Sequence, residues 1–365
     1  METKILAFHL PQFHTFPEND EWWGTGFTEW TNTRNSKKLY AGHNQPREPL
    51  NDFYYDLSKP EDIAWEMDLA KQYGIDGFCF YHYWFNGKLL LEKPIKLMKD
   101  LDNRLPYCFC WANEPWIRSW EGSKAVLIEQ TYGGENDWQA HFQWFLPYFH
   151  DIKYIKKGNK PVLALYGTKN IAQCNEMILY WDRLCKQEGF DGIYVLEEKT
   201  GFQDALYCEA SSGYLEFEPL YTLKYQRTIL QKLRDKIVRS LFNLMHNTDC
   251  LMYSYDQVWK NILRREHEQI NEKDVCLGGF VDWDNTARKG KNSTWFYGAT
   301  PGKFEKYLGG QMKNASKLKA PFVFLNAWNE WGEGTYLEPD KKSEFKYIEK
   351  IKELRTKEKI NVNED

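Results

Sequence analysis

The sequence predicts an α/β fold, a (β/α)8 TIM barrel. Two observations predict it: short apolar runs rich in β-branched and aromatic residues recur along the chain, and segments with helical spacing of apolar residues separate them. Strands without polar alternation are typical of a parallel sheet that is covered on both faces. Eight such strands close a barrel. The predicted strands are "KILAFHL" (4–10), "IDGFCFYHYW" (75–84), "PYCFCWAN" (106–113), "PVLALYG" (161–167), "GIYVLEE" (192–198), the weaker "ALYCEASSGYL" (205–215), "CLGGFVDW" (276–283) and "PFVFLNAW" (321–328).

Two similar helix-to-strand joints support this alternation. Before the second strand, "SKPEDIAWEMDLAKQYGIDG" has Ser58 as a helix N-cap, Pro60 near the helix start and Gly74 at its end. Before the fifth strand, "EMILYWDRLCKQEGFDG" repeats the arrangement and ends its helix at Gly189. The same joint at two places is what a repeated α/β unit requires.

Two segments are longer than the connections that a minimal barrel needs. Residues 11–57 form an aromatic loop after strand one, and about 220–272 form a helical, polar insertion. A length of 365 residues suits one barrel with insertions. We therefore expect a single (β/α)8 barrel over 1–345, which includes the insertion, and a C-terminal helix and tail over 346–365.

The insertion contains a basic segment, 222–242, with six basic side chains and one acidic side chain and hence a net charge of +5. Two interpretations stay open for it. One is a solvated helical insertion, and the other is a contact with anionic lipid or with a diphosphate-linked substrate.

Composition narrows the function. The chain has 48 basic and 52 acidic residues, and a net charge of −4 argues against a nucleic-acid partner. Aromatic residues make up 17% of the chain, with 16 Trp and 23 Tyr. Part of this aromatic content is core, but flat rings with polar edges also suit the C–H faces and hydroxyls of a sugar.

The compartment is predicted to be reducing and cytoplasmic. The eight cysteines form no C-x-x-C pair, and Cys79, Cys108 and Cys276 lie in apolar runs, where a thiol is a small buried hydrophobe. The apolar stretch after Met1 is too short for a signal-peptide core. No apolar run reaches the roughly 18 residues of a membrane span. The segment considered for peripheral membrane contact is 222–242, for which both interpretations stay open.

Polar and aromatic residues cluster at the predicted carboxyl ends of the strands, where barrels of this kind build their active sites. Strands one and two end near His9, Gln12, Tyr81, His82 and Trp84, and strand three ends near Trp111, Asn113 and Glu114. Strands seven and eight end near Asp282, Trp283, Asp284, Asn329, Glu330, Trp331 and Glu333, and the aromatic loop adds Trp30.

Glu330 and Glu333 are the candidate catalytic pair. Cleavage of a glycosidic bond needs two carboxyl groups on one sugar, and residues three apart on a helical turn have Cβ atoms about 5–6 Å apart. Trp328 and Trp331 would exclude water and raise the pKa of the group that must stay protonated. The spacing equally allows that one acid caps the next helix or pairs with a lysine.

No cofactor and no metal is expected. "DWD" (282–284) resembles the metal-binding D-x-D of nucleotide-sugar transferases, but this pattern is common by chance. The histidines have no zinc-binding spacing, so hydrogen bonding to a sugar is the better role for His82. Glycine-rich nucleotide loops and a serine elbow are also missing from the sequence.

Five stretches together resemble the WbsX family. The resemblance is dense over about 1–135 and 276–340 and weak between about 200 and 275. Members are labelled glycosyltransferases or lipopolysaccharide biosynthesis proteins of bacterial surface-polysaccharide loci, with a domain like that of the family 99 glycoside hydrolases, the endo-α-mannosidases. The stretches are "LPQFHTFPENDEWWGTGFTEWTN" (10–32), "GHNQPREPL" (42–50), "GIDGFCFYHYWFNGKLLLEKP" (74–94), "CWANEPWIRSWEG" (110–122) and "NAWNEWGEGTYLEPD" (326–340).

The mannosidase likeness implies a role for each acid, because "NEWGE" (329–333) is similar to the catalytic N-E-W-x-E segment of that family. Glu330 would be the base that helps the 2-hydroxyl of the sugar attack the anomeric carbon. Glu333 would be the acid that protonates the leaving oxygen and later activates the acceptor. The route retains configuration through a 1,2-anhydro sugar. The sequence departs from the family at Gly332, where the mannosidases typically carry a histidine.

Three functions follow. The first is an enzyme of O-antigen or lipopolysaccharide biosynthesis that acts on an oligosaccharide or polysaccharide, in one version linked to a lipid diphosphate. The second is a retaining endo-acting glycoside hydrolase of α-mannosidase type. The third is a glycan-binding barrel without catalysis, which the presence of both glutamates disfavours.

Overall fold

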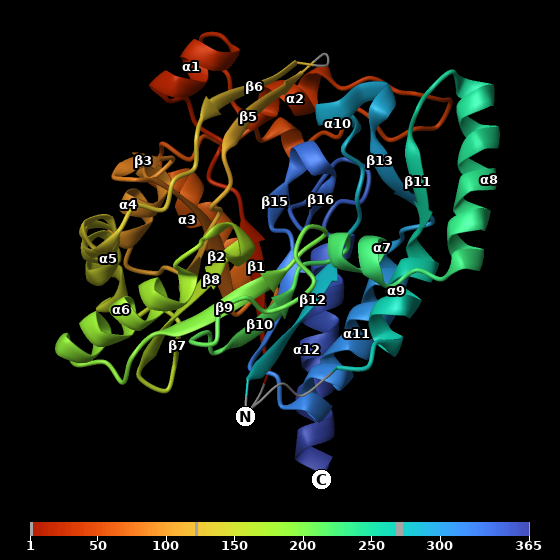
Figure 1. Ribbon diagram of the computed structural model, residues 1–365. Helices are drawn as coiled ribbons and strands as arrows, with labels where there is room; N and C mark the ends of the chain where they lie inside the picture. The colour runs from red at the N-terminus through yellow and green to blue at the C-terminus, as the bar shows by residue number, and fades with distance from the viewer. Residues whose placement is uncertain (1–2, 121–122, 268–272, 365) are drawn as a thin grey trace.

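The computed structural model describes residues 3–120, 123–267 and 273–364. In this part of the chain eight parallel strands form a closed barrel, because β1 pairs both with β2 and with the last strand, β14 (Figure 1). Each of the eight predicted runs overlaps one strand, so the predicted fold is confirmed, although β10 begins only at Gly213, near the end of the run predicted over 205–215. The barrel strands are β1 (Lys4–His9), β2 (Gly77–Phe85), β4 (Tyr107–Trp111), β8 (Lys160–Leu165), β9 (Tyr194–Lys199), β10 (Gly213–Glu216), β12 (Asp274–Phe280) and β14 (Phe322–Asn326).

Helices surround the barrel (Figure 1). They are α3 (Pro60–Gln72), α4 (Lys93–Lys99), α5 (Glu135–Phe149), α6 (Cys174–Gln187), α9 (Tyr255–Arg264), α11 (Pro301–Leu318) and α12 (Lys346–Glu364). The two glycines predicted to end helices are confirmed in that role. Gly74 and Gly189 follow α3 and α6 with φ of 89° and 87°. The predicted N-cap of α3 was wrong: Lys59 takes that position. Pro60 favours the first helical position, which moves the cap one residue beyond Ser58.

The aromatic loop 11–57 contains two helices, α1 (Pro17–Trp23) and α2 (Glu29–Asn35), and the short turn Leu50–Asp52. Both helices lie at one end of the barrel, at the top of Figure 1, together with α10 (Thr286–Lys289) and the hairpin of β5 (Trp116–Trp120) and β6 (Ser123–Ile128). Smaller elements are β3 (Lys88–Leu90), β7 (Lys156–Lys157), β15 (Asn329–Glu330), β16 (Thr335–Tyr336) and the 3-10 turns Thr168–Asn170, Gly290–Asn292 and Trp331–Glu333.

The predicted insertion is mainly helical, and part of it stands away from the barrel. After β10 the chain forms α7 (Leu220–Tyr225) and the longer α8 (Ile229–His246). It then adds β11 (Leu251–Ser254), which pairs in parallel with β13 (Thr294–Tyr297), before α9 returns to the barrel. The end of the predicted insertion, 268–272, lies outside the described residues.

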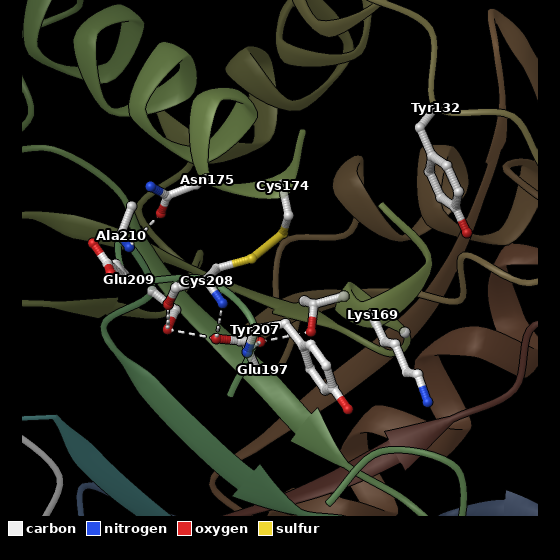
Figure 2. Close-up of a disulfide and its surroundings, with 12 residues drawn as sticks. Tyr132, Lys169, Cys174, Asn175, Glu197, Tyr207, Cys208, Glu209 and Ala210 are labelled. Carbon is white, nitrogen blue, oxygen red and sulfur yellow. Dashed lines mark hydrogen bonds between the residues drawn. A yellow bond between two sulfur atoms is a disulfide. The ribbon is translucent and has the colours of Figure 1, made fainter. Parts of the chain in front are cut away.

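The loop between β9 and β10 is fastened to the barrel by a disulfide and by a buried carboxylate (Figure 2). Cys174, the first residue of α6, is bonded to Cys208. Beside it Glu197 accepts hydrogen bonds from the Thr168 and Ser211 hydroxyls at 2.6 and 2.7 Å, and from two backbone amides of the loop. A disulfide is typical of an oxidising environment, so this bond does not support the predicted reducing, cytoplasmic location. That location stays a prediction.

The C-terminal helix packs on α11. Lys350 and Lys357 both pair with Glu305, at 3.6 and 2.5 Å, and Tyr347 contacts the Phe304 ring. The helix predicted from residue 346 continues to Glu364, and residue 365 lies outside the described residues. The domain boundary at 345 stays a prediction. Among the described helices, none combines the length and apolar character needed to span a bilayer.

Candidate active site

A cavity of about 380 Å³ opens at the carboxyl ends of the barrel strands. Aromatic rings and charged groups line it together, which is the lining that a sugar requires. The aromatic lining is Trp23, Phe27, Tyr81, Tyr83, Phe85, Trp116, Tyr166 and Phe217. The polar lining is Gln12, Glu29, Asn32, Glu114, Arg288, Lys289, Glu330 and Glu333.

The segment after β14 places both candidate catalytic glutamates in this cavity. Asn329 fastens the segment to the end of β1, because its side chain accepts from the Leu10 amide at 2.7 Å and donates to the Leu10 carbonyl at 3.0 Å. Trp331 stacks on Tyr336 at 3.8 Å between ring centres. β15 pairs with β16 around the 3-10 turn, so Glu330 and Glu333 are held on one rigid turn.

Arg288 joins the two glutamates. Its guanidinium donates to Glu330 at 3.0 Å and to Glu333 at 2.8 Å. The third donor, Nε, lies 2.9 Å from the carboxylate of Glu29, which α2 supplies from the aromatic loop. The open question of whether one acid pairs with a cation is resolved: both do, and they share one arginine.

Gly332 makes room for this arrangement. A Cβ atom at this position would lie 2.8 Å from Arg288 Nε and 2.8 Å from Glu29 Oε1, closer than real Cβ contacts. The histidine expected from the family resemblance would therefore collide with the ion pair. The glycine at position 332 thus leaves the space in which Arg288 and Glu29 form their ion pair.

Burial and charge set the protonation of the cluster. Burial raises the pKa of Glu330 and of Glu333, and the Arg288 charge opposes this rise for both carboxyl groups. Three carboxylates face one guanidinium, so repulsion among them favours retention of a proton. The Glu330 side chain is 8% exposed and that of Glu333 is 26% exposed. Glu333 is thus the more accessible group for proton exchange with a bound molecule.

Five of the fifteen residues predicted for the site line the cavity: Gln12, Tyr81, Glu114, Glu330 and Glu333. The other ten lie outside the cavity lining, in the layer behind or beneath it. They are His9, Trp30, His82, Trp84, Trp111, Asn113, Asp282, Trp283, Asn329 and Trp331.

Strand alternation explains the residues of β2. Tyr81, Tyr83 and Phe85 line the cavity, whereas the side chains between them point to the helices outside the barrel. His82 lies 2.8 Å from His141 of α5, and Trp84 donates to Asp137 of the same helix at 3.0 Å. Burial lowers the pKa of His82 to about 3, which keeps its imidazole neutral. This placement favours a packing role over the predicted sugar contact.

The remaining residues support the site from behind. His9 lies 3.1 Å from Glu66, and Trp30 packs on Trp331 with 5.2 Å between ring centres. Trp111 donates to the Trp84 carbonyl at 3.2 Å, and Asn113 holds the backbone of Gly167 through two hydrogen bonds.

Basic side chains of the aromatic loop bind the acids of the "DWD" segment. Asp282 pairs with Arg47 at 2.9 Å, and Asp284 lies 2.9 Å from His43, while Trp283 packs in the cluster around α9. Contacts with His43 and Arg47 hold the pKa of Asp284 well below its usual range, against the effect of burial. These carboxylates fasten the loops around the cavity.

Sequence reasoning missed Arg288 and Glu29, together with Tyr83, Trp116, Tyr166 and Phe217 of the lining. One general signal could have found Arg288. Two acids in a buried site require a cation, and Arg288 and Lys289 follow strand seven on the same face of the barrel. Glu29 carries no such signal, because it reaches the site from the aromatic loop.

Solved structures with this architecture include glycoside hydrolases. A protein described as glycoside hydrolase-like has a TM-score of 0.60 at 12% identity, over 97% of this chain and 94% of the other. The GH99 endo-alpha-mannosidase from Bacteroides thetaiotaomicron has a TM-score of 0.55 at 11% identity, over 98% of each chain. At these identities the likeness shows the fold, which is the TIM barrel.

Sequence comparison places the chain in a family. The protein WxcX from two strains of Xanthomonas campestris pv. campestris, described as uncharacterized, is 33% identical over 97% of this chain and 50% of its own length. The chain thus spans about half the length of these curated relatives. A model of the family described as glycosyltransferase WbsX matches residues 5–351. The chain therefore belongs to the WbsX glycosyltransferase family of carbohydrate-active proteins.

Proposed function

We propose that the protein makes or remodels a glycosidic bond in the biosynthesis of a bacterial surface polysaccharide, with retention of configuration at Glu330 and Glu333. One observation carries the proposal: both glutamates face the same aromatic cavity and share the guanidinium of Arg288. The family and the barrel fold support a carbohydrate substrate. We propose that the substrate is an oligosaccharide or polysaccharide. One form of this proposal has the glycan linked to a lipid diphosphate.

In the first step, the 2-oxygen of the sugar attacks the anomeric carbon while Glu330 accepts the proton of that 2-hydroxyl. The bond from that carbon to the leaving oxygen breaks, and Glu333 protonates the leaving oxygen. The product is a 1,2-anhydro sugar. In the second step, Glu333 accepts a proton from the acceptor hydroxyl, whose oxygen opens the three-membered ring. Glu330 returns its proton to the 2-oxygen, and the configuration at the anomeric carbon is retained.

Exposure distinguishes the two acids, whereas burial and Arg288 act on both. Burial raises the pKa of Glu330 to about 8 and also raises the pKa of Glu333, and Arg288, which donates to both carboxylates, opposes the rise. The greater exposure of Glu333 suits contact with the leaving group and the acceptor, and this supports its role as the acid. The same electrostatics fit transfer and hydrolysis alike, because these reactions differ only in the acceptor.

A second candidate function is a retaining endo-acting hydrolase. It is favoured by the architecture shared with a structure named as an endo-alpha-mannosidase. A barrel that binds glycans without turnover is disfavoured, because the cavity keeps two carboxyl groups and a cation that joins them.

The test is Glu333→Gln, which removes a proton donor and acceptor without changing volume. Purified protein is incubated with mannose- and rhamnose-containing oligosaccharides, with and without sugar acceptors, and the products are identified by mass spectrometry and the anomeric configuration by NMR. We expect turnover to fall at least about 100-fold, because positioned proton transfer contributes about that much or more.

Glu209→Gln is the matched control, since Glu209 is exposed and lies outside the cavity. It should keep wild-type turnover, and both variants should keep the wild-type melting temperature. Wild-type turnover by Glu333→Gln, or products with inverted configuration, would contradict the proposed roles.

A further inference from the structure

Helix α8 turns an apolar face toward solvent. Seven of its large hydrophobic side chains are more than half exposed: Ile229 (77%), Leu230 (78%), Leu233 (53%), Ile237 (61%), Leu241 (58%), Leu244 (83%) and Met245 (71%). None of its eighteen residues is buried. Helical spacing of about 100° per residue places these seven side chains on one continuous face. Figure 1 shows α8 at the outer edge of the molecule, beside β11.

The opposite face of α8 is largely polar and packs on the protein. Asp235 accepts from Arg227 at 3.0 Å, Gln231 donates to Asn261 at 3.2 Å, and Asn243 donates to the Cys250 carbonyl at 3.1 Å. Phe242 contributes an aromatic contact, with its ring centre 5.3 Å from that of Trp295. A surface helix normally buries its apolar face and exposes its polar face. In α8 this arrangement is reversed.

Local capping signals define both ends of α8. The Thr228 hydroxyl accepts from the Gln231 amide at 3.2 Å, and the Gln231 side chain accepts from the Thr228 amide at 3.0 Å, which forms a capping box. Asn247 ends the helix in the left-handed conformation. The exposed face is therefore a property of an ordered helix with defined ends.

Basic side chains border the apolar face. Lys232 and Lys236 lie along one edge, Arg234 lies along the other, and all three are exposed. Asp235, the one acidic residue of the helix, is directed inward and paired with Arg227. Apolar side chains between exposed cations are typical of a helix that lies in the interface of an anionic bilayer, where the cations reach phosphate groups.

We propose that α8 docks the protein on an anionic lipid bilayer, with its apolar face inserted at the level of the headgroups. The charge pattern favours this partner over a second copy of the chain. Two copies joined through α8 would bring the same positive borders together, with no exposed acid on the helix to neutralise them. The proposal does not depend on the proposed reaction, since α8 contributes no residue to the cavity lining.

The test is co-sedimentation of the full chain with two kinds of vesicle, phosphatidylcholine alone and phosphatidylcholine mixed with phosphatidylglycerol. We expect binding to the anionic vesicles to be at least about tenfold tighter, and to weaken at high salt. Leu233→Gln/Ile237→Gln/Leu244→Gln should abolish the binding. Lys232→Gln/Arg234→Gln/Lys236→Gln should abolish the preference for anionic lipid.

The matched control changes three equally apolar and exposed side chains far from α8 in sequence, as Ile152→Gln/Leu179→Gln/Phe202→Gln. It should bind like the wild type. Because all the changed side chains are exposed, every variant should keep its melting temperature. Failure of the wild type to bind, or wild-type binding by the apolar α8 variant, would overturn the proposal. A dimer in light scattering that the same α8 variant dissociates would assign this face to a second copy instead.

Discussion

Two neighbouring buried carboxyl groups of this barrel differ sharply in their hydrogen-bond partners. Glu197 and Glu198 are neighbours on β9, and both are fully buried. Glu197 accepts four hydrogen bonds, whereas Glu198 accepts one, from the Cys110 thiol at 2.9 Å. Burial raises the pKa of Glu198 to about 8. Two adjacent glutamates are thus expected to respond in opposite ways to the same substitution.

We predict that Glu198→Gln stabilises the fold at alkaline pH. The unfolded chain titrates this group near pH 4.3, and the folded chain titrates it near 8. Between these values the folded state holds the proton and the unfolded state does not, so wild-type stability falls as pH rises through this window. The amide removes this dependence. Urea unfolding at pH 9 should show a gain of about 1–3 kcal/mol for Glu198→Gln, and the gain should shrink toward pH 5.

Glu197→Gln is the matched control for this prediction. An amide at this position would direct an N–H group at donors that now reach a carboxylate oxygen, so this variant should lose stability. A Glu198→Gln gain that stays constant from pH 5 to 9 would contradict the assigned cause.

Among the elements, the 3-10 turn Trp331–Glu333 is the one on which the candidate site depends. It is anchored through Asn329 and Trp331, and its central glycine leaves the space that Arg288 and Glu29 occupy. An element of three residues thereby holds two carboxylates at fixed positions relative to one guanidinium.

We predict that Gly332→Ala lowers turnover while the barrel stays folded. The added Cβ would lie 2.8 Å from Arg288 Nε, so the guanidinium must move away from the turn and from both glutamates. Displacement of this size is expected to cost about tenfold or more in kcat. Steady-state kinetics on the substrate identified for the wild type would measure it.

Gly302→Ala is the matched control, because a Cβ at Gly302 in α11 meets no atom within 4 Å. It should have wild-type kcat and KM. Equal kcat for Gly332→Ala and the wild type would show that Arg288 need not lie against the turn.

At the scale of the whole molecule, the closed barrel unites loops that are distant in the chain around one cavity. A ligand that binds this cavity in the folded state alone must stabilise the entire fold. We predict that a mannose- or rhamnose-containing oligosaccharide raises the melting temperature. At a concentration of about 100 times Kd the stabilisation is about 2.7 kcal/mol, which corresponds to several degrees.

Dinucleotides serve as the comparison in this thermal-shift measurement, because the sequence has no glycine-rich fingerprint for them. They should leave the melting temperature unchanged. A shift with dinucleotides and none with oligosaccharides would contradict a sugar-binding cavity.

The sequence by itself determined the barrel. Strands enclosed between a packed interior and outer helices must be apolar on both sides. The sequence therefore contains eight recognisable apolar runs. The glycines after α3 and α6 were predictable for an equally local reason, their positive φ. The pair Glu330 and Glu333 was also visible, since its spacing and its place after strand eight are properties of one short segment.

Only the tertiary structure decided which side chains meet. Position at a strand end did not separate Tyr81 and Tyr83, which line the cavity, from His82 between them, because alternate residues of a strand point to opposite faces. Arg288 and Glu29 are 259 residues apart, and no local pattern couples them. The periodicity of α8 likewise defines an apolar face but not its direction. Local spacing fixes the geometry of one element, whereas contacts between elements depend on how the whole chain packs.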